Sequence, residues 1–151
     1  MTKRILLING PNLNLLGTRQ PEIYGSDTLD AIQARLREHF TRQDVELRFS
    51  QSNHEGEIID RIHEARSWAD GIALNAGAYS HYSYAIRDAI TAVKLPVVDI
   101  HLSNVHARDP FRHNLVITPV CVGTVAGFGW RSYLWAIEAL LAYLEDLPQK
   151  R

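Results

Sequence analysis

The sequence contains almost no cysteine and no long apolar run. Cys121 is the one cysteine among 151 residues, so the chain cannot form an internal disulfide. No segment approaches the roughly 20 apolar residues of a membrane helix, and the apolar run at 5–8 is too short for a signal peptide. We therefore expect a cytoplasmic protein that does not contact a membrane.

Charge is balanced, and lysine is scarce. The 16 basic and 17 acidic residues give a formal net charge of −1, so there is no reason to expect a nucleic-acid partner. Thirteen of the basic residues are arginines. The three lysines are Lys3, Lys94 and Lys150, which lie near the two ends of the chain or late in a predicted helix. None is placed for imine chemistry.

Several cofactor motifs are also missing. No lysine is followed by Ser or Thr, which excludes a phosphate-binding GxxxxGK[ST] loop. The segment after the first predicted strand reads GPNLNLLG rather than the GxGxxG of a dinucleotide site. HExxH and closely spaced sets of metal ligands are absent from the sequence as well. We therefore expect neither a metal nor an organic cofactor.

What the chain does contain is a repeated alternation of strand and helix patterns. With 46% apolar and 22% charged residues, its length suits a single domain spanning 1–151. Strands are predicted at 4–8, 45–49, 71–74, 96–102 and 120–126, and helices at 27–43, 55–69, 82–93 and around 134–144. Ser26 and Asp27 are both candidates for the N-cap of the first helix. This alternation predicts an α/β fold: a flavodoxin-like, doubly wound, five-stranded parallel sheet of order 2-1-3-4-5 in three α/β/α layers.

Polar residues gather in the loops after the first, third and fourth predicted strands. In such sheets ligands bind beyond the carboxyl ends of the strands, so these loops are the candidate site. The loop at 9–26 is long for its position, which is typical of binding loops and lids. Asp99 and His101 are two apart on one strand and therefore share a face. A carboxylate beside an imidazole orients it and favours its protonated form, as a general acid requires.

A flavodoxin-like ligand-binding or signalling module without catalysis is the alternative. Fold alone supports it. A phosphoacceptor receiver needs an aspartate at the end of the third strand, where this chain has Asn75, and a lysine at the end of the fifth. A non-catalytic module would also leave the three polar loops without a role.

Three segments make the chain recognisable: GPNLNLLGTRQPEIYG, LNAGAYSHYSYAIRDA and VVDIHLSNVHARDPFR. In order, spacing and content they resemble type II 3-dehydroquinate dehydratases, over nearly the whole chain. The resemblance implies a hydro-lyase of the shikimate pathway, toward chorismate and the aromatic amino acids, although quinate breakdown uses the same step. It converts 3-dehydroquinate to 3-dehydroshikimate and water by anti elimination through an enolate, without a metal or a Schiff base.

The resemblance also implies roles for individual residues. Tyr24 is the base that removes the C2 proton, with Arg19 beside it. His101 protonates the departing C1 hydroxyl, and Asn12 steadies the enolate through a bound water.

Further positions are implied to bind or support the substrate. Asn75, His81 and Arg112 hold its hydroxyls, and the backbone amides of Leu102 and Ser103 receive its carboxylate. Asp88 reaches the lid of a neighbouring subunit, since the family assembles trimers into a dodecamer. The supporting motif positions are Pro11, Gly77, Asp99 and Arg108.

The physics of a tyrosine base requires a nearby cation. A tyrosine is almost wholly protonated at neutral pH, since its ordinary pKa is about 10. One arginine at about 4 Å contributes on the order of 4 kcal/mol toward a phenolate at an effective dielectric of 20, before desolvation opposes it. The interaction energy of Arg19 alone is therefore large enough to favour a phenolate, and Arg108 or Arg112 can add to it.

Three positions depart from the family pattern. Position 99 is usually glutamate, and Asp99 is one methylene shorter, so we expect its contact with His101 to be longer or bridged by water. Ser80 replaces the usual threonine but keeps the hydroxyl. Asn114 and Leu115 replace a basic residue and a serine.

Overall fold

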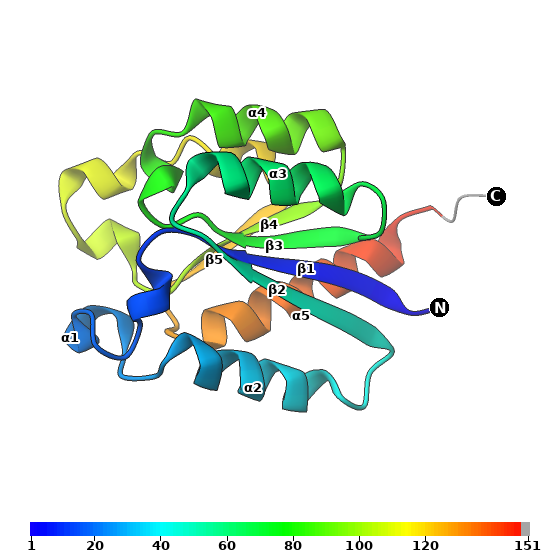
Figure 1. Cartoon of the computed structure of the whole chain (residues 1–151), viewed down its shortest axis with the longest axis horizontal. Coiled ribbons are helices and arrows are strands. Elements are labelled where there is room, and N and C mark those ends of the chain that lie inside the picture. The colour runs from blue at the N-terminus through cyan, green and yellow to red at the C-terminus, as the bar shows by residue number, and fades with distance from the viewer. Residues whose placement is uncertain (149–151) are drawn as a thin grey trace.

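Five parallel strands form one sheet in the computed structural model, which describes residues 1–148 (Figure 1). The strands are β1 (Lys3–Asn9), β2 (Val45–Gln51), β3 (Gly71–Asn75), β4 (Val97–His101) and β5 (Gly123–Ala126). Their order across the sheet is β2-β1-β3-β4-β5, as predicted. The order reverses between β1 and β3, so the loops that follow these two strands diverge to opposite faces and leave a crevice between them.

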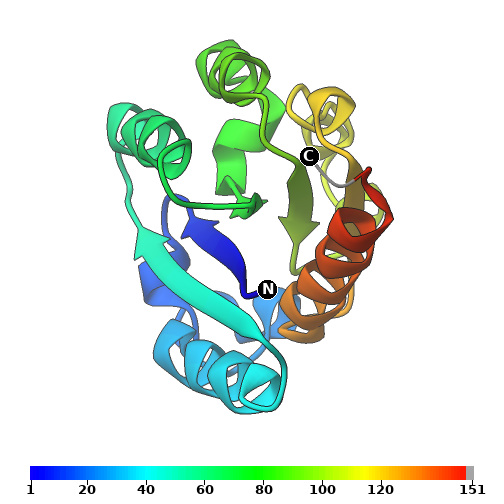
Figure 2. The same cartoon turned by 90° about the vertical axis from the view of Figure 1, so that its right-hand side faces the viewer.

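Helices cover both faces of this sheet and complete the three predicted layers. The long helices are α2 (Leu29–Phe40), α3 (Glu55–Ala65), α4 (Tyr84–Val93) and α5 (Arg131–Asp146). Helices α3 and α4 lie on one face, and α2 and α5 lie on the other (Figures 1 and 2). Each face has its own apolar core, one built with α2 and α5 and the other with α3 and α4. Within residues 1–148, every helix is too short or too polar to span a membrane.

Tyr82, which begins the helical pattern predicted at 82–93, is exposed and precedes α4, whereas the pattern predicted at 27–43 matches the buried face of α2. On α2 the buried side chains are Leu29, Ile32, Leu36 and Phe40, which recur at the helical period. The predicted N-cap is wrong, however. Thr28 caps α2, because its hydroxyl accepts a hydrogen bond from the amide of Ala31, whereas Asp27 forms an ion pair with Arg35 at 3.0 Å.

The fifth strand is shorter than predicted. Thr118–Val120 forms a 3₁₀ turn, η5, and β5 begins only at Gly123. The reason is Pro119, whose fixed φ and missing N–H favour a turn over a strand with a hydrogen-bonded neighbour.

The long loop after β1 contains two short helical pieces, η1 (Leu13–Leu15) and α1 (Pro21–Tyr24). Leu13 and Leu16 are buried and attach the loop to the core shared with α2 and α5. The last three residues of the predicted domain, 149–151, lie outside the described residues.

Candidate active site

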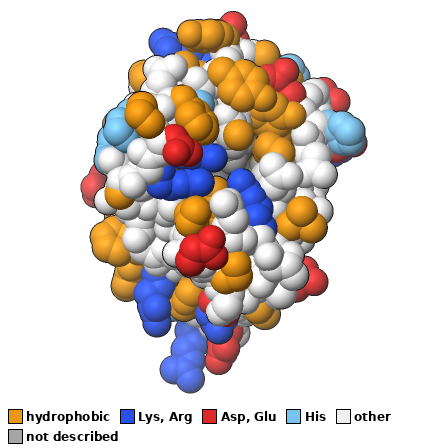
Figure 3. Space-filling model, turned by 90° about the vertical axis from the view of Figure 1, so that its left-hand side faces the viewer, with side chains coloured by type: hydrophobic (Ala, Val, Ile, Leu, Met, Phe, Trp, Pro, Cys, Tyr) orange, Lys and Arg blue, Asp and Glu red, His pale blue; other side chains and the backbone are white. Residues whose placement is uncertain are grey.

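A cleft opens at the carboxyl ends of the strands, between the loops that follow β1, β3 and β4. The free space in it is about 450 Å³ when the part open to solvent is included. Basic side chains lie near the middle of this face of the molecule (Figure 3). The residues that line it are Pro11, Asn12, Leu13, Arg19, Tyr24, Asn75, Gly77, Ala78, His81, His101, Leu102, Ser103, Val105, Arg108 and Arg112.

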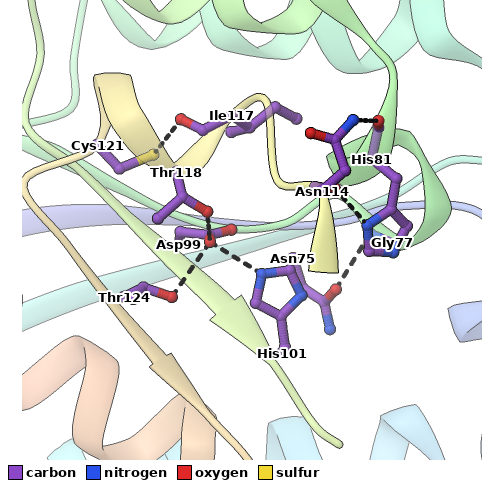
Figure 4. A network of polar contacts seen from close by, with 10 residues as sticks. All are labelled: Asn75, Gly77, His81, Asp99, His101, Asn114, Ile117, Thr118, Cys121 and Thr124. Carbon is purple, nitrogen blue, oxygen red and sulfur yellow. Dashed lines mark hydrogen bonds and ion pairs between the residues drawn. The ribbon is translucent and has the colours of Figure 1, made fainter. Parts of the chain in front are cut away.

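At the end of β4, His101 is held by a buried carboxylate. Its Nε2 donates to Oδ2 of Asp99 at 2.8 Å, and the exposed fractions of the two side chains are 6% and 0% (Figure 4). The expectation of a longer or water-bridged contact is therefore wrong. Because both side chains leave β4 on the same face, the shorter aspartate still reaches the ring. Since Nε2 is engaged by Asp99, Nδ1 is the ring nitrogen available to a substrate.

Tyr24 lines the same cleft at the end of α1, with two arginines over its ring. The guanidinium carbon of Arg19 is 4.4 Å from the centroid of the Tyr24 ring, and that of Arg108 is 4.9 Å from it. A cation at this distance is attracted to the ring face. Arg108 also donates to the hydroxyl of Ser103 at 3.2 Å, which ties the loop after β4 to Tyr24.

Arg112 has partners of its own in the loop after β4. Its guanidinium lies over the ring of Phe111 at 4.7 Å and pairs with Asp109 at 3.5 Å. Phe111 is its neighbour in the 3₁₀ turn η4 (Pro110–His113), and Asp109 is the N-cap of that turn. Of the two arginines that the sequence offers beside Arg19, the fold thus brings Arg108 to the tyrosine and leaves Arg112 at the cleft wall.

His81 has one ring nitrogen committed to the backbone. Nδ1 donates to the carbonyl of Asn114 at 2.9 Å, so Nε2 of the neutral ring is a hydrogen-bond acceptor. Burial lowers the pKa of His81, and the charges of Arg112, His101 and Arg108 lower it further, against the opposing hydrogen bond to Asn114. His81 is therefore neutral at neutral pH and suited to accept a hydrogen bond from a hydroxyl.

The amide of Asn75 is oriented by partners on both sides. Its Oδ1 accepts the Gly77 amide at 3.1 Å, and its Nδ2 donates to the hydroxyl of Tyr133 at 3.0 Å. Tyr133 in turn donates to Oδ1 of Asn9 at 2.5 Å. Since Nδ2 carries a second hydrogen, the side chain retains a donor for a ligand.

Close backbone packing joins the loops after β1 and β3. Asn12 has left-handed backbone geometry at φ 68°, and its amide donates to Oδ1 of Asn53 at 3.0 Å. A Cβ at Gly10 would lie 2.6 Å from the carbonyl oxygen of Ala76, so only glycine fits there. Gly77 has φ +60° and lies against Pro11, which explains both supporting motif positions.

Comparison with known proteins agrees with this geometry. The family model Dehydroquinase class II matches residues 3–141. A 3-dehydroquinate dehydratase of Bacillus cereus (strain AH187) is 50% identical over 144 residues, which is 95% of this chain and 99% of that protein. The chain belongs to the class II dehydroquinase family.

Solved structures of class II dehydroquinases share the fold. The type II dehydroquinase from Butyrivibrio crossotus DSM 2876 aligns with a TM-score of 0.91 and 46% identity, over 93% of this chain and 98% of that one. The type II dehydroquinase from Propionibacterium acnes aligns with a TM-score of 0.88 and 38% identity, over 97% and 99%.

Most of the site residues predicted for a class II dehydroquinase do meet in one cleft. Two do not line it. Asp99 is buried behind His101, and Asp88 is exposed on α4. Asp88 does not line the cleft of its own chain. Its predicted contact with a neighbouring subunit stays a prediction.

Sequence reasoning missed the residues that hold the site from behind. Tyr133, Thr118, Thr124 and Asn53 contact Asn75, Asp99 or Asn12 through single hydrogen bonds. The helical spacing that places Leu134 and Ile137 on the buried face of α5 also places Tyr133 beside that face. A tyrosine expected to be buried was therefore the one feature of the sequence that could have revealed a supporting residue. The threonines carry no such signal, because they belong to a turn and to a short edge strand.

Proposed function

We propose that the chain is a 3-dehydroquinate dehydratase, a lyase that forms 3-dehydroshikimate and water. One observation carries the proposal: a tyrosine with two arginines over its ring lines the same cleft as a histidine backed by a buried carboxylate. This arrangement supplies a base and an acid at separate points of one small site, as an elimination of water requires. We place the reaction in the shikimate pathway.

In the first step Tyr24 acts as the base. Its phenolate oxygen takes the C2 proton, and the electron pair of that C–H bond passes into the C3 carbonyl to form an enolate. Arg19 and Arg108 supply the positive charge beside the base, since their guanidinium carbons lie over the ring at 4.4 and 4.9 Å from its centroid. Asn12 steadies the enolate oxygen, and the exposed side chain of Asn12 lines the cleft.

In the second step His101 acts as the general acid. The enolate reforms the carbonyl, the C1–C2 double bond forms, and the C1–O bond breaks as the hydroxyl takes a proton from Nδ1 of His101. Water leaves, and Tyr24 and His101 later exchange protons with solvent. Asp99 holds the ring so that Nδ1 faces the cleft, and it stabilises the imidazolium before transfer.

The substrate is held by the polar walls of the cleft. Asn75 and His81 offer a donor and an acceptor to its hydroxyls, and Arg112 adds a charged donor. The backbone amides of Leu102 and Ser103 receive the carboxylate at the end of β4.

We propose that no imine and no metal takes part. Lys3 begins β1, at the end of the strands away from the cleft, and Lys94 is the C-cap of α4. Neither lysine lines the cleft. Lys150 lies outside the described residues. The carbonyl group of the substrate is instead activated by hydrogen bonds to its enolate.

We further propose a cytoplasmic homododecamer built from trimers. Asp88 is exposed on α4, one helical turn from the exposed ring of Tyr84, which supports a subunit contact along this helix. In such an assembly Asp88 closes a neighbouring site. Sedimentation of the native protein tests this proposal, and a stable, fully active monomer would refute it.

A single assay tests the proposed reaction. The purified protein is incubated with 3-dehydroquinate, and the ultraviolet absorbance of the conjugated product is followed. We expect turnover that persists in borohydride and in a chelator, and no turnover by a Tyr24→Phe variant. Folded wild-type protein that leaves the substrate unchanged would overturn the proposed function.

A further inference from the structure

Three donors converge on one oxygen of Asp99. Oδ2 accepts Nε2 of His101 at 2.8 Å, the hydroxyl of Thr118 at 2.6 Å and the hydroxyl of Thr124 at 3.2 Å (Figure 4). Among the described residues, the other oxygen, Oδ1, is buried and has no hydrogen-bond partner. The histidine and the two threonines therefore all form hydrogen bonds to the same charged group.

The two threonines cannot act on a substrate directly. Neither is among the residues that line the cleft, and Asp99 separates both from His101. Thr118 belongs to the turn η5, and Thr124 belongs to the edge strand β5. Any effect they have on the reaction passes through the Asp99 carboxylate.

We propose that Thr118 and Thr124 are positioning residues that hold the Asp99 carboxylate and stabilise its charge when His101 gives up its proton. This inference rests on the proposed role of His101 as general acid. It assigns a function to a turn and an edge strand that lie outside the cleft.

The physical argument compares the pair before and after proton transfer. Before transfer, the imidazolium of His101 balances the buried charge of Asp99. After transfer the ring is neutral, and the carboxylate depends on hydrogen bonds, because a buried charge without partners is costly. The hydroxyls therefore stabilise the later state more than the earlier one, which makes His101 a better acid. Thr118, at 2.6 Å, contributes more than Thr124, at 3.2 Å.

The other titratable groups near Asp99 and His101 do not take over the stabilising effect of the threonines. Burial raises the pKa of the Cys121 thiol, and the charge of Asp99 raises it further, so the thiol stays neutral. His81 faces His101 from η2 (Gly77–His81) and is neutral, since its pKa is lowered. The charged or titratable groups that share the cleft with His101 are Arg19, Tyr24, Arg108 and Arg112. These stay the same in the variants below.

The test uses isosteric variants of the full-length protein. Thr118→Val and Thr124→Val remove one hydroxyl each, and Thr118→Ser restores it. Thr41→Val is the matched control, because the exposed Thr41 hydroxyl donates only to the Arg37 carbonyl at the end of α2, far from the cleft. Circular dichroism checks that each variant folds.

We expect Thr118→Val to lower kcat for 3-dehydroquinate by up to ~10-fold, the largest loss that an acid weaker by about one pKa unit produces. KM stays close to that of the wild type. His101 holds its proton more tightly in this variant, so the alkaline limb of the kcat profile moves to higher pH, by about one unit. Thr124→Val shows the same changes to a smaller degree, and Thr118→Ser behaves as the wild type.

A second measurement does not depend on turnover. Carbon-13 NMR of histidine labelled at Cε1 follows the titration of the His101 ring, with the His101→Gln variant identifying its resonance. A higher midpoint in Thr118→Val than in the wild type supports the proposal. An unchanged or lower midpoint, or equal effects of Thr118→Val and Thr41→Val, would overturn it. If the wild type lacks dehydratase activity, the proposed function fails, while the titration still decides the role of the threonines.

Discussion

The hydroxyl of Tyr133 accepts a hydrogen bond from the amide of Asn75 at 3.0 Å, inside the core and 58 residues away along the chain. Tyr133 is completely buried, and burial raises the pKa of its hydroxyl above the ordinary range, so it remains protonated. The same hydroxyl donates to Asn9 at the end of β1. One side chain of α5 therefore connects the ends of two strands with a wall of the cleft.

Removing this hydroxyl is expected to affect both stability and binding. Tyr133→Phe leaves Oδ1 of Asn9 without its donor and frees the Asn75 amide to rotate. We expect the free energy of unfolding in urea to fall by about 1–3 kcal/mol and KM to rise. Tyr143→Phe on the exposed side of the same helix is the control. Equal stability of the two variants would show that the buried hydroxyl contributes nothing.

Tyr24→Phe is expected to abolish exchange of the C2 proton. The variant keeps the ring and its arginine contacts but has no oxygen to take the proton. Proton NMR of 3-dehydroquinate in heavy water measures the exchange directly, without requiring elimination. If the variant exchanges the C2 proton at the wild-type rate, Tyr24 is not the base.

The two arginines over the Tyr24 ring should each matter. Arg19→Gln and Arg108→Gln remove a cation at 4.4 or 4.9 Å, and we expect kcat to fall by ~10- to 100-fold in each. Arg37→Gln is the matched control, because Arg37 lies in the same way over Phe49, at 4.5 Å, away from the cleft. A normal kcat in Arg108→Gln would contradict its role at the base.

His101→Ala should separate the two steps of the reaction. In the proposed mechanism, proton abstraction depends on Tyr24, whereas loss of the hydroxyl depends on His101 as the acid. We expect elimination to slow much more than C2 exchange, by ~100-fold or more against a small change. Exchange by NMR and product absorbance, measured on the same samples, provide the comparison. An equal loss of both rates would argue against general-acid catalysis by this residue.

His81 should make the folded state less stable in mild acid. Because burial lowers the pKa of His81 below 6.5, the unfolded chain binds this proton more tightly than the folded chain. The free energy of unfolding therefore falls as the pH drops below 6.5, and this contribution is absent at higher pH. In urea unfolding at neutral and mildly acidic pH, His81→Gln should lose less stability on acidification than the wild type. The exposed His63→Gln should match the wild type.

Much of the site could be predicted from the sequence because its residues follow the ends of strands. The alternation of apolar runs and amphipathic segments predicted the sheet and its order, and parallel strands bring their carboxyl ends to one edge. Asp99 and His101 were predicted to pair because two residues on a strand share a face. The contact distance was predicted wrongly, because it depends on side-chain rotamers within β4 and on the threonines around the carboxylate.

The sequence by itself determined the five strands and four long helices, the strand order, the family and most of the residues that line the cleft, because periodicity and motifs are local properties of the chain. Only the tertiary structure decided that Tyr133 supports Asn75, that Arg108 rather than Arg112 covers Tyr24, and that Thr118 and Thr124 hold Asp99. These contacts join segments that are far apart along the chain. Each is a single directional bond whose partner is chosen by how the helices and loops pack, which spacing along the sequence does not encode.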